Sequence, residues 1–366
     1  MRIGVITYSR SKDNYGQILQ CYALQEVLKQ KGHSPFLIRY RTDTKLTKPG
    51  FKIKNLWKYV SRFQHYITWY KNKKQANENE VNYQNSVDVE KRNFEGFIKN
   101  RIDATPFYNS QTIHDNPPTA DAYICGSDQI WGSDDAYYLS FAPDDALKIA
   151  YAPSFGGLKD FSEERAENMK RLISRLNKVS MREQSGVETC QKLGFENVIQ
   201  VLDPTLLLKA EDYRKIAKEP CEKEFGFTYL LGSPIDVSIE EIDNFIKNRE
   251  LKHIYVASQG RYDEFEKIDA TIEEWLGYID NASLVITNSF HCAVFALIFH
   301  KPLIVIPLSG SWSRMNTRVS ELLEKSNLSQ LLTSNLKDVK LDELNFTKFE
   351  NYIETERINS LNFLDI

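Results

Sequence analysis

The chain has 366 residues, of which 42% are hydrophobic and 27% charged, and its formal net charge is −3. This length favours two domains, and the nearly balanced charge gives no general attraction to nucleic acid. The five cysteines lack the spacing of a zinc site or of a disulfide framework, so a reducing, cytoplasmic location fits best. The N-terminus is typical of a strand rather than a signal peptide, and no apolar stretch is long enough to span a bilayer.

Residues 1–208 predict a first α/β domain. An apolar strand, IGVIT, is followed by a polar loop, the helical stretch QILQCYALQEVLKQKG and a second strand, SPFLIRY. Apolar residues recur at helical spacing in that stretch, and Gly32 suits its C-terminal cap. Further strand-like runs are DAYICG, LKIAYAP, KVSMRE and NVIQVLD. Strands that alternate with helices predict a doubly wound parallel sheet.

Residues 45–120 interrupt this alternation and predict a helical insertion in the first domain. From Lys45 to Lys74 the sequence has nine basic residues and no acidic one. Apolar residues of this segment fall on one helical face, and Lys58, Arg62 and His65 fall on the other. Such a helix either packs its apolar face on the protein and shows its charges to water, or lies on an anionic membrane surface.

Residues 222–314 predict a second, shorter α/β domain after a polar connection. Its strand-like runs are FTYLLGS, HIYVAS, SLVITNS and PLIVIPL. Residues 315–366 predict a helical tail that can pack back on the first domain. The expected architecture is therefore α/β, with two Rossmann-like domains that face a cleft, as in a GT-B-like fold.

The loop after the strand SLVIT holds the foremost candidate for chemistry, His291. Ligands bind beyond the carboxyl ends of strands in open α/β sheets, and His291 stands there, where an apolar helix begins. Its imidazole could hold an anion together with free helix N–H groups, or move a proton near neutral pH. The structural alternative is a histidine that caps the helix and is covered by apolar side chains.

The stretch CGSDQIW, residues 125–131, follows another predicted strand. Asp128 and Gln129 can form hydrogen bonds with hydroxyl groups, and Trp131 offers a flat ring, so the stretch suits a sugar. The alternative is a tight turn with Asp128 as a helix cap and Trp131 in the core.

Arg182 ends the strand KVSM and could bind a carboxylate or phosphate through two parallel hydrogen bonds. It could instead form a surface pair with Glu183 or a buried structural ion pair. In the first loop, Asn14 either lines the cleft or caps the helix, with Gly16 permitting the turn. This loop is neither a dinucleotide-binding nor a P-loop motif.

Taken together, these stretches resemble the polysaccharide pyruvyl transferase family. The matching segments are NYGQILQCYALQEVL, CGSDQIW, YAPSFG, SMREQSG, VLDPTLLL and TNSFHCAVFALIFHKPLIVI, in the family's order. The resemblance implies transfer of a pyruvyl group from phosphoenolpyruvate to a sugar, usually as a cyclic ketal, with the donor in the interdomain cleft. It implies no redox cofactor, since phosphoenolpyruvate is the donor substrate, and it does not decide whether a divalent ion assists. A lipid-linked oligosaccharide acceptor would give the 45–74 segment a purpose at the inner face of the cell membrane.

The resemblance also implies roles for particular residues. The family's essential histidine and arginine fall on His291, as general acid, and Arg182, as anion clamp. Some members carry Arg-Leu before the histidine, where this chain has Ser289 and Phe290, so one cation is missing. The expected donor-binding residues are Asn288, Ser289, Ser258 and, as replacements for the missing cation, Arg314 or Arg318. The expected acceptor-binding residues are Asn14, Tyr15, Ser127, Asp128, Gln129, Trp131 and Ser154.

Two other functions fit the same predicted architecture, because a fold does not determine a function. One is a nucleotide-sugar-dependent glycosyltransferase, in which Glu273 or Glu274 would bind a ribose. The other is a non-catalytic, two-lobed sugar-binding protein, which would leave the pairing of Arg182 with His291 unexplained. The residue patterns predict no metal site and no nucleic-acid partner.

Overall fold

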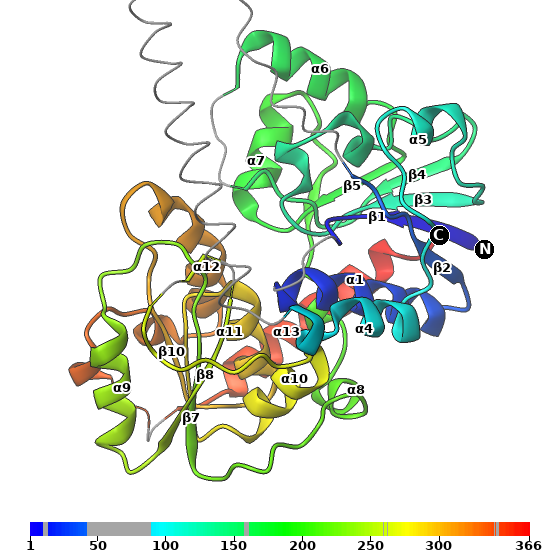
Figure 1. Ribbon diagram of the computed structural model, residues 1–366. Helices are drawn as coiled ribbons and strands as arrows, with labels where there is room; N and C mark the ends of the chain where they lie inside the picture. Colours follow the sequence, from blue (N-terminus) through cyan, green and yellow to red (C-terminus); the bar gives the residue numbers. More distant parts are fainter. Residues whose placement is uncertain are drawn as a thin grey trace, which may run out of the picture.

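The computed structural model describes residues 1–9, 14–41, 89–156, 161–258, 260–261, 263–339, 341 and 344–366. The basic segment at 45–74 lies outside the described residues, so its membrane contact stays a prediction. Two parallel β-sheets with helices around them form the described part (Figure 1). Among its helices, none combines the length and the apolar character needed to cross a membrane.

The first sheet has six parallel strands in the order β2-β1-β3-β4-β5-β6. Its strands are β1 (Arg2–Ile6), β2 (Ser34–Leu37), β3 (Ala122–Cys125), β4 (Leu147–Ala150), β5 (Lys178–Met181) and β6 (Ile199–Gln200). Its α-helices are α1 (Tyr15–Gln30), α3 (Val89–Arg92), α4 (Phe94–Arg101), α5 (Thr112–Asp115), α6 (Glu163–Ile173) and α7 (Gln184–Lys192). Short 3-10 helices are η1 (Ile130–Gly132), η2 (Asp135–Tyr138) and η3 (Pro204–Leu206). The predicted doubly wound sheet is confirmed.

The second sheet has four parallel strands in the order β10-β9-β7-β8. Its strands are β7 (Phe225–Tyr229), β8 (Lys252–Val256), β9 (Leu284–Thr287) and β10 (Leu303–Val305). The helices that follow β6 are α8 (Ala210–Arg214), α9 (Ile239–Lys247), α10 (Ile272–Asn281), α11 (Phe290–Ile298), α12 (Thr317–Lys325) and α13 (Thr347–Phe363). Further 3-10 helices are η4 (Gly310–Asn316), η5 (Ser329–Leu331) and η6 (Leu336–Asp338). The two Rossmann-like domains expected from the sequence are confirmed.

Helix α1 lies between the two domains, where it joins their cores (Figure 1). Twelve of its sixteen residues are buried, and Gln20 and Gln25 are 0% exposed. The Tyr15 ring stacks on Trp275 of α10, with centroids 4.9 Å apart. The helix is therefore buried over most of its surface rather than along one apolar face, and Gln20 and Gln25 are uncharged amides at buried positions.

Both sheets have a point where the strand order reverses. In the first sheet β1 lies between β2 and β3, and in the second β7 lies between β8 and β9. Loops leave such a point in opposite directions and open a crevice at the carboxyl ends of the strands. The loops after β1, β3, β7 and β9 line one cavity, so the two crevices face each other.

The C-terminal tail returns to the first domain. Ser360 of α13 accepts a hydrogen bond at Oγ from the backbone N–H of Leu202, at 2.9 Å. Arg357 donates from Nε to the carbonyl of Leu206, at 3.1 Å. Both contacts bind helix α13 to the segment that follows β6.

Replacing Ser360 by Ala should lower the free energy of unfolding by about 1–3 kcal/mol, because the buried Leu202 N–H loses its acceptor. Thr355→Ala is the matched control, since Thr355 is exposed and its hydroxyl bonds only within α13. Urea denaturation of both variants measures the difference. Equal unfolding midpoints would show that the tail is not held by this hydrogen bond.

Candidate active site

A cavity of about 510 Å³ lies between the two domains. The first domain contributes Asn14 and Asp128, and the second contributes Ser289 and His291. Arg318 of α12 completes its wall. This volume lies within the range of small-molecule binding sites, and the wall combines amide, carboxylate, imidazole and guanidinium groups.

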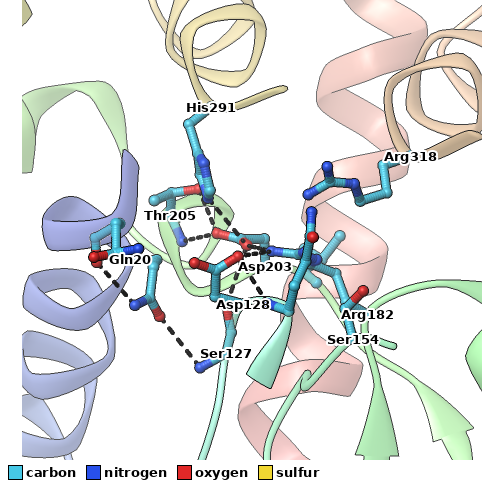
Figure 2. Close-up of polar contacts among 12 residues, drawn as sticks. Gln20, Ser127, Asp128, Ser154, Arg182, Asp203, Thr205, His291 and Arg318 are labelled. Atoms are coloured by element: carbon cyan, nitrogen blue, oxygen red, sulfur yellow. Dashed lines mark hydrogen bonds and ion pairs between the residues drawn. The ribbon is translucent and has the colours of Figure 1, made fainter. Parts of the chain in front are cut away.

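His291 stands in the first turn of α11 and is nearly buried, with 8% of its surface exposed. Its helix begins at Ser289, whose Oγ accepts from the Cys292 N–H at 3.5 Å. The imidazole Nε2 lies 3.5 Å from Oδ2 of Asp203, across the domain boundary (Figure 2). The histidine predicted from the second domain therefore meets a carboxylate of the first.

Gly16 allows this meeting. A Cβ atom at Gly16 would lie 2.2 Å from both Cγ and Nδ1 of His291, well inside van der Waals contact. The sequence interpretation of Gly16, that it permits a turn, was wrong, because the residue lies within the first turn of α1. Its missing side chain instead gives room for the imidazole. Asn14 caps this helix, with Oδ1 accepting from the Gln17 N–H at 3.2 Å, while it also lines the cavity.

The carboxylate of Asp203 is the centre of the site and was not assigned from the sequence. Its Oδ1 accepts from the Thr205 hydroxyl at 2.7 Å, and its Oδ2 from Arg182 Nη1 at 3.1 Å and Ser127 Oγ at 3.3 Å. Burial opposes its ionisation, but His291, Arg182 and Thr205 outweigh burial and hold the pKa of Asp203 well below its usual range. Its place at the end of the strand-like run NVIQVLD was the available signal.

Arg182 lies behind Asp203 and is itself buried. Its Nε donates to Glu183 at 3.2 Å, and its Nη1 also lies 3.8 Å from Asp128. Burial disfavours its charge, yet these carboxylates together raise the pKa of Arg182. Arg182 lines a small cavity of about 40 Å³ rather than the large one, and its Nη2 has no partner among the described residues. The buried ion pair considered as an alternative is therefore present.

Arg318 brings a second guanidinium to the start of α11. Arg182 and Arg318 each lie 5.5 Å from the ring centre of Phe290. With its amide oxygen turned toward Arg318, Gln129 accepts from Nη2 at 2.8 Å and from Nη1 at 3.1 Å. Burial and the neighbouring Arg182 charge lower the pKa of Arg318 to about 10, so it stays charged at neutral pH.

Arg314, the other predicted replacement for the missing cation, is placed differently. It is exposed and lines a neighbouring cavity of about 120 Å³, together with Ser154. Among the described residues, Arg318 borders both this cavity and the larger one that contains His291.

Four predicted ligand-binding residues have structural contacts instead. The Asn288 side chain accepts from the Leu231 N–H at 2.7 Å and donates to the Leu231 carbonyl at 3.1 Å. The Ser258 hydroxyl donates to the carbonyl of Leu230. Both side chains therefore stabilise the loop after β7. Tyr15 and Trp131 are 0% exposed, which corrects the expectation that they contact an acceptor. Local sequence could not separate a ring in the core from a ring in the cleft.

Ser127 and Ser154 are also buried, and neither lines the large cavity. Ser127 is 0% exposed, and its backbone N–H donates to Gln20 Oε1 at 3.2 Å. Ser154 accepts at Oγ from the Gly156 N–H at 3.1 Å. Ser127 thus supports Asp203, while Asp128 and Gln129 beside it do line the large cavity.

Glu273 and Glu274 do not form a ribose site. Glu274 accepts from the Thr271 N–H at 3.0 Å and from Lys218 at 2.8 Å, so it completes the N-terminal cap of α10. Neither glutamate lines the large cavity. In the described part of the chain, no group of three or more histidine, cysteine, aspartate or glutamate side chains is arranged to hold a metal ion.

Comparison with known proteins identifies one family. The sequence profile described as "Polysaccharide pyruvyl transferase" matches residues 14–310. No curated protein matches the chain by sequence. Solved structures with a similar course include MnaA of S. aureus with UDP, at 13% identity and TM-score 0.41, covering 99% of this chain and 97% of that one. The glycosyltransferase SnogD of Streptomyces nogalater has 12% identity and TM-score 0.40, with 99% and 95% covered.

Replacing Gly16 by Ala should reduce turnover by about 100-fold, because the new methyl group displaces the His291 imidazole. Alanine favours a helix over glycine by up to about 1 kcal/mol, so loss of helix α1 would not be the cause. Gly96→Ala of α4 is the control, since the atoms it would meet belong to the exposed side chain of Asn93. Steady-state kinetics measures the turnover of both variants, and circular dichroism checks that both are folded. Full activity of Gly16→Ala would refute the role of Gly16 in making room for the His291 ring.

Proposed function

Because the chain belongs to the polysaccharide pyruvyl transferase family, we propose that it transfers a pyruvyl group from phosphoenolpyruvate to a sugar of a surface-polysaccharide precursor. The product is a ketal across two hydroxyl groups. One observation carries this proposal: His291 of the second domain faces the buried Asp203 carboxylate of the first, at the wall of a cavity of about 510 Å³. That cavity can accommodate a three-carbon donor beside a sugar ring.

In this proposal His291 is the general acid. Its Nε2 lies 3.5 Å from Oδ2 of Asp203, so the carboxylate attracts a proton on Nε2. The imidazolium is then the proton donor of the reaction. A carboxylate that orients a catalytic histidine in this way both selects the ring orientation and stabilises the charged imidazolium.

The reaction is balanced by the two acceptor hydroxyl groups. The methylene carbon of phosphoenolpyruvate takes the proton from His291, and the adjacent carbon becomes electrophilic. One sugar hydroxyl attacks that carbon, the bond to the phosphate oxygen breaks, and a neighbouring hydroxyl closes the ketal. Of the two hydroxyl protons, one restores His291 and the other leaves with phosphate. The scheme needs no cofactor beyond the donor.

Arg318 serves as the donor's anion clamp in this scheme. It lies over Phe290, next to the position where some relatives carry their arginine, and it lines the cavity together with His291. Its only carboxylate contact in the described structure is Glu183, at 3.9 Å, so its guanidinium is less neutralised than that of Arg182. A guanidinium fork matches the oxygens of a carboxylate or phosphate.

Arg182 acts through Asp203. Its Nε and Nη1 are taken by Glu183 and Asp203, and its Nη2 alone remains for an anion. We therefore assign Arg182 to positioning: it keeps Asp203 ionised and aimed at His291. The anion clamp expected from the sequence moves from Arg182 to Arg318.

Purified protein with phosphoenolpyruvate and candidate glycans should release phosphate only when an acceptor is present, and the acceptor should gain the mass of a pyruvyl ketal. His291→Gln should fold normally but lose about 10²–10⁴-fold in kcat, as expected for a missing general acid. His114→Gln is the control, because His114 of α5 is exposed. Release of UDP from a nucleotide-sugar, without pyruvyl transfer, would favour the glycosyltransferase alternative.

Arg318→Ala should raise the KM for phosphoenolpyruvate by roughly 10-fold or more, the cost of a lost charged hydrogen bond, whereas Arg314→Ala should change it by less than about twofold. The two arginines lie four residues apart, so they form a matched pair. The thermal shift on adding phosphoenolpyruvate gives a second readout that needs no acceptor. The assignment of Arg318 as the anion clamp fails if Arg314→Ala raises the KM for phosphoenolpyruvate more than Arg318→Ala does.

A further inference from the structure

Trp312 differs from the other tryptophans that the structure describes. Trp131 and Trp275 are 0% exposed, whereas Trp312 is 46% exposed. Trp312 also belongs to none of the hydrophobic clusters formed by the described residues. Its indole therefore contributes little to the core, although an exposed ring of this size has an unfavourable contact with water.

Hydrogen bonds anchor the segment that carries Trp312 at both of its ends. In front of η4, the Ser309 N–H donates to the carbonyl of Pro234 at 2.9 Å. At the end of η4, the Asn316 side chain forms two hydrogen bonds with the backbone of Leu308, both 2.9 Å. The turn that carries Trp312 is therefore anchored at both of its ends.

Trp312 lines the same cavity as His291 and Arg318. The first domain contributes the amide and carboxylate side chains of Asn14, Gln17 and Asp128 to this cavity. A flat aromatic surface combined with groups that bind hydroxyls suits a sugar ring, whose C–H face is apolar and whose edge is polar.

A protein-docking role for Trp312 has less support. The other large hydrophobic side chains that are exposed in the described part of the chain are Met1, Phe107, Ile199 and Ile358, and none belongs to the Trp312 segment. A docking surface for a protein usually needs a contiguous apolar patch. A single indole inside a cavity is better suited to one ring.

We propose that Trp312 is the platform on which the pyranose ring of the acceptor stacks. This inference rests on the proposed function and adds the residue that selects a ring-shaped acceptor. The donor is bound by Arg318, and the acceptor lies between the indole and the amide side chains of the first domain. Trp312 thus determines acceptor affinity without taking part in proton transfer.

Saturation-transfer NMR without phosphoenolpyruvate tests the platform directly. The probes are the methyl β-D-pyranosides of glucose, galactose, mannose and N-acetylglucosamine. At least one probe should bind the wild type. Its affinity for Trp312→Ala should be about tenfold lower, and its affinity for Trp312→Phe should lie between the two, in keeping with the strength of ring contacts. Phe107→Ala, which removes an exposed ring that does not line this cavity, should bind like the wild type.

Equal binding by wild type and Trp312→Ala would overturn the platform, and so would the absence of binding by every probe. Kinetics then separate the two proposals. Trp312→Ala should raise the KM for the acceptor and leave the KM for phosphoenolpyruvate unchanged. If pyruvyl transfer proceeds with an unchanged acceptor KM, the platform is wrong and the proposed function stands. If no pyruvyl transfer occurs but pyranoside binding still depends on Trp312, the platform stands and the proposed function is wrong.

Discussion

The buried carboxylate of Asp203 is the interaction on which the site depends. An unpaired charge cannot stay ionised at so little exposure, and Asp203 is therefore surrounded by Arg182, Thr205 and Ser127 from its own domain. Its remaining neighbour, His291, comes from the second domain. The electrostatics of one carboxylate thus link the position of the catalytic histidine to the packing of the two domains.

Helix α1 and the C-terminal tail provide the frame for this contact. Helix α1 is buried in the core shared by both domains, and its Gly16 lies directly against the His291 ring. Helix α13 binds the segment after β6, through Ser360 and Leu202, immediately before Asp203. Elements distant in sequence therefore converge on the two residues whose separation matters most. A site between domains gains its geometry from such shared packing rather than from any single loop.

The sequence predicted a large part of this arrangement. Strand and helix periodicity identified both parallel sheets, and the rule that ligands bind at the carboxyl ends of strands located His291, Asp128 and Arg182. The same rule applied equally to Asp203, but nothing local distinguished it from an ordinary turn. Tyr15 and Trp131 were assigned to the acceptor because a ring beside a strand end is compatible with both a cleft and a core. Burial decides between the two, and burial depends on the packing of other elements.

By itself, the sequence determined the type and order of the elements, the family and the place of His291 at the start of a helix, because these follow from local periodicity and motif order. Only the tertiary structure decided which charges meet. Arg318 lies beside Phe290 although 28 residues separate them, and Asp203 meets His291 across 88 residues. Such contacts depend on how two domains pack, and no pattern along the chain records the distance between side chains that packing brings together.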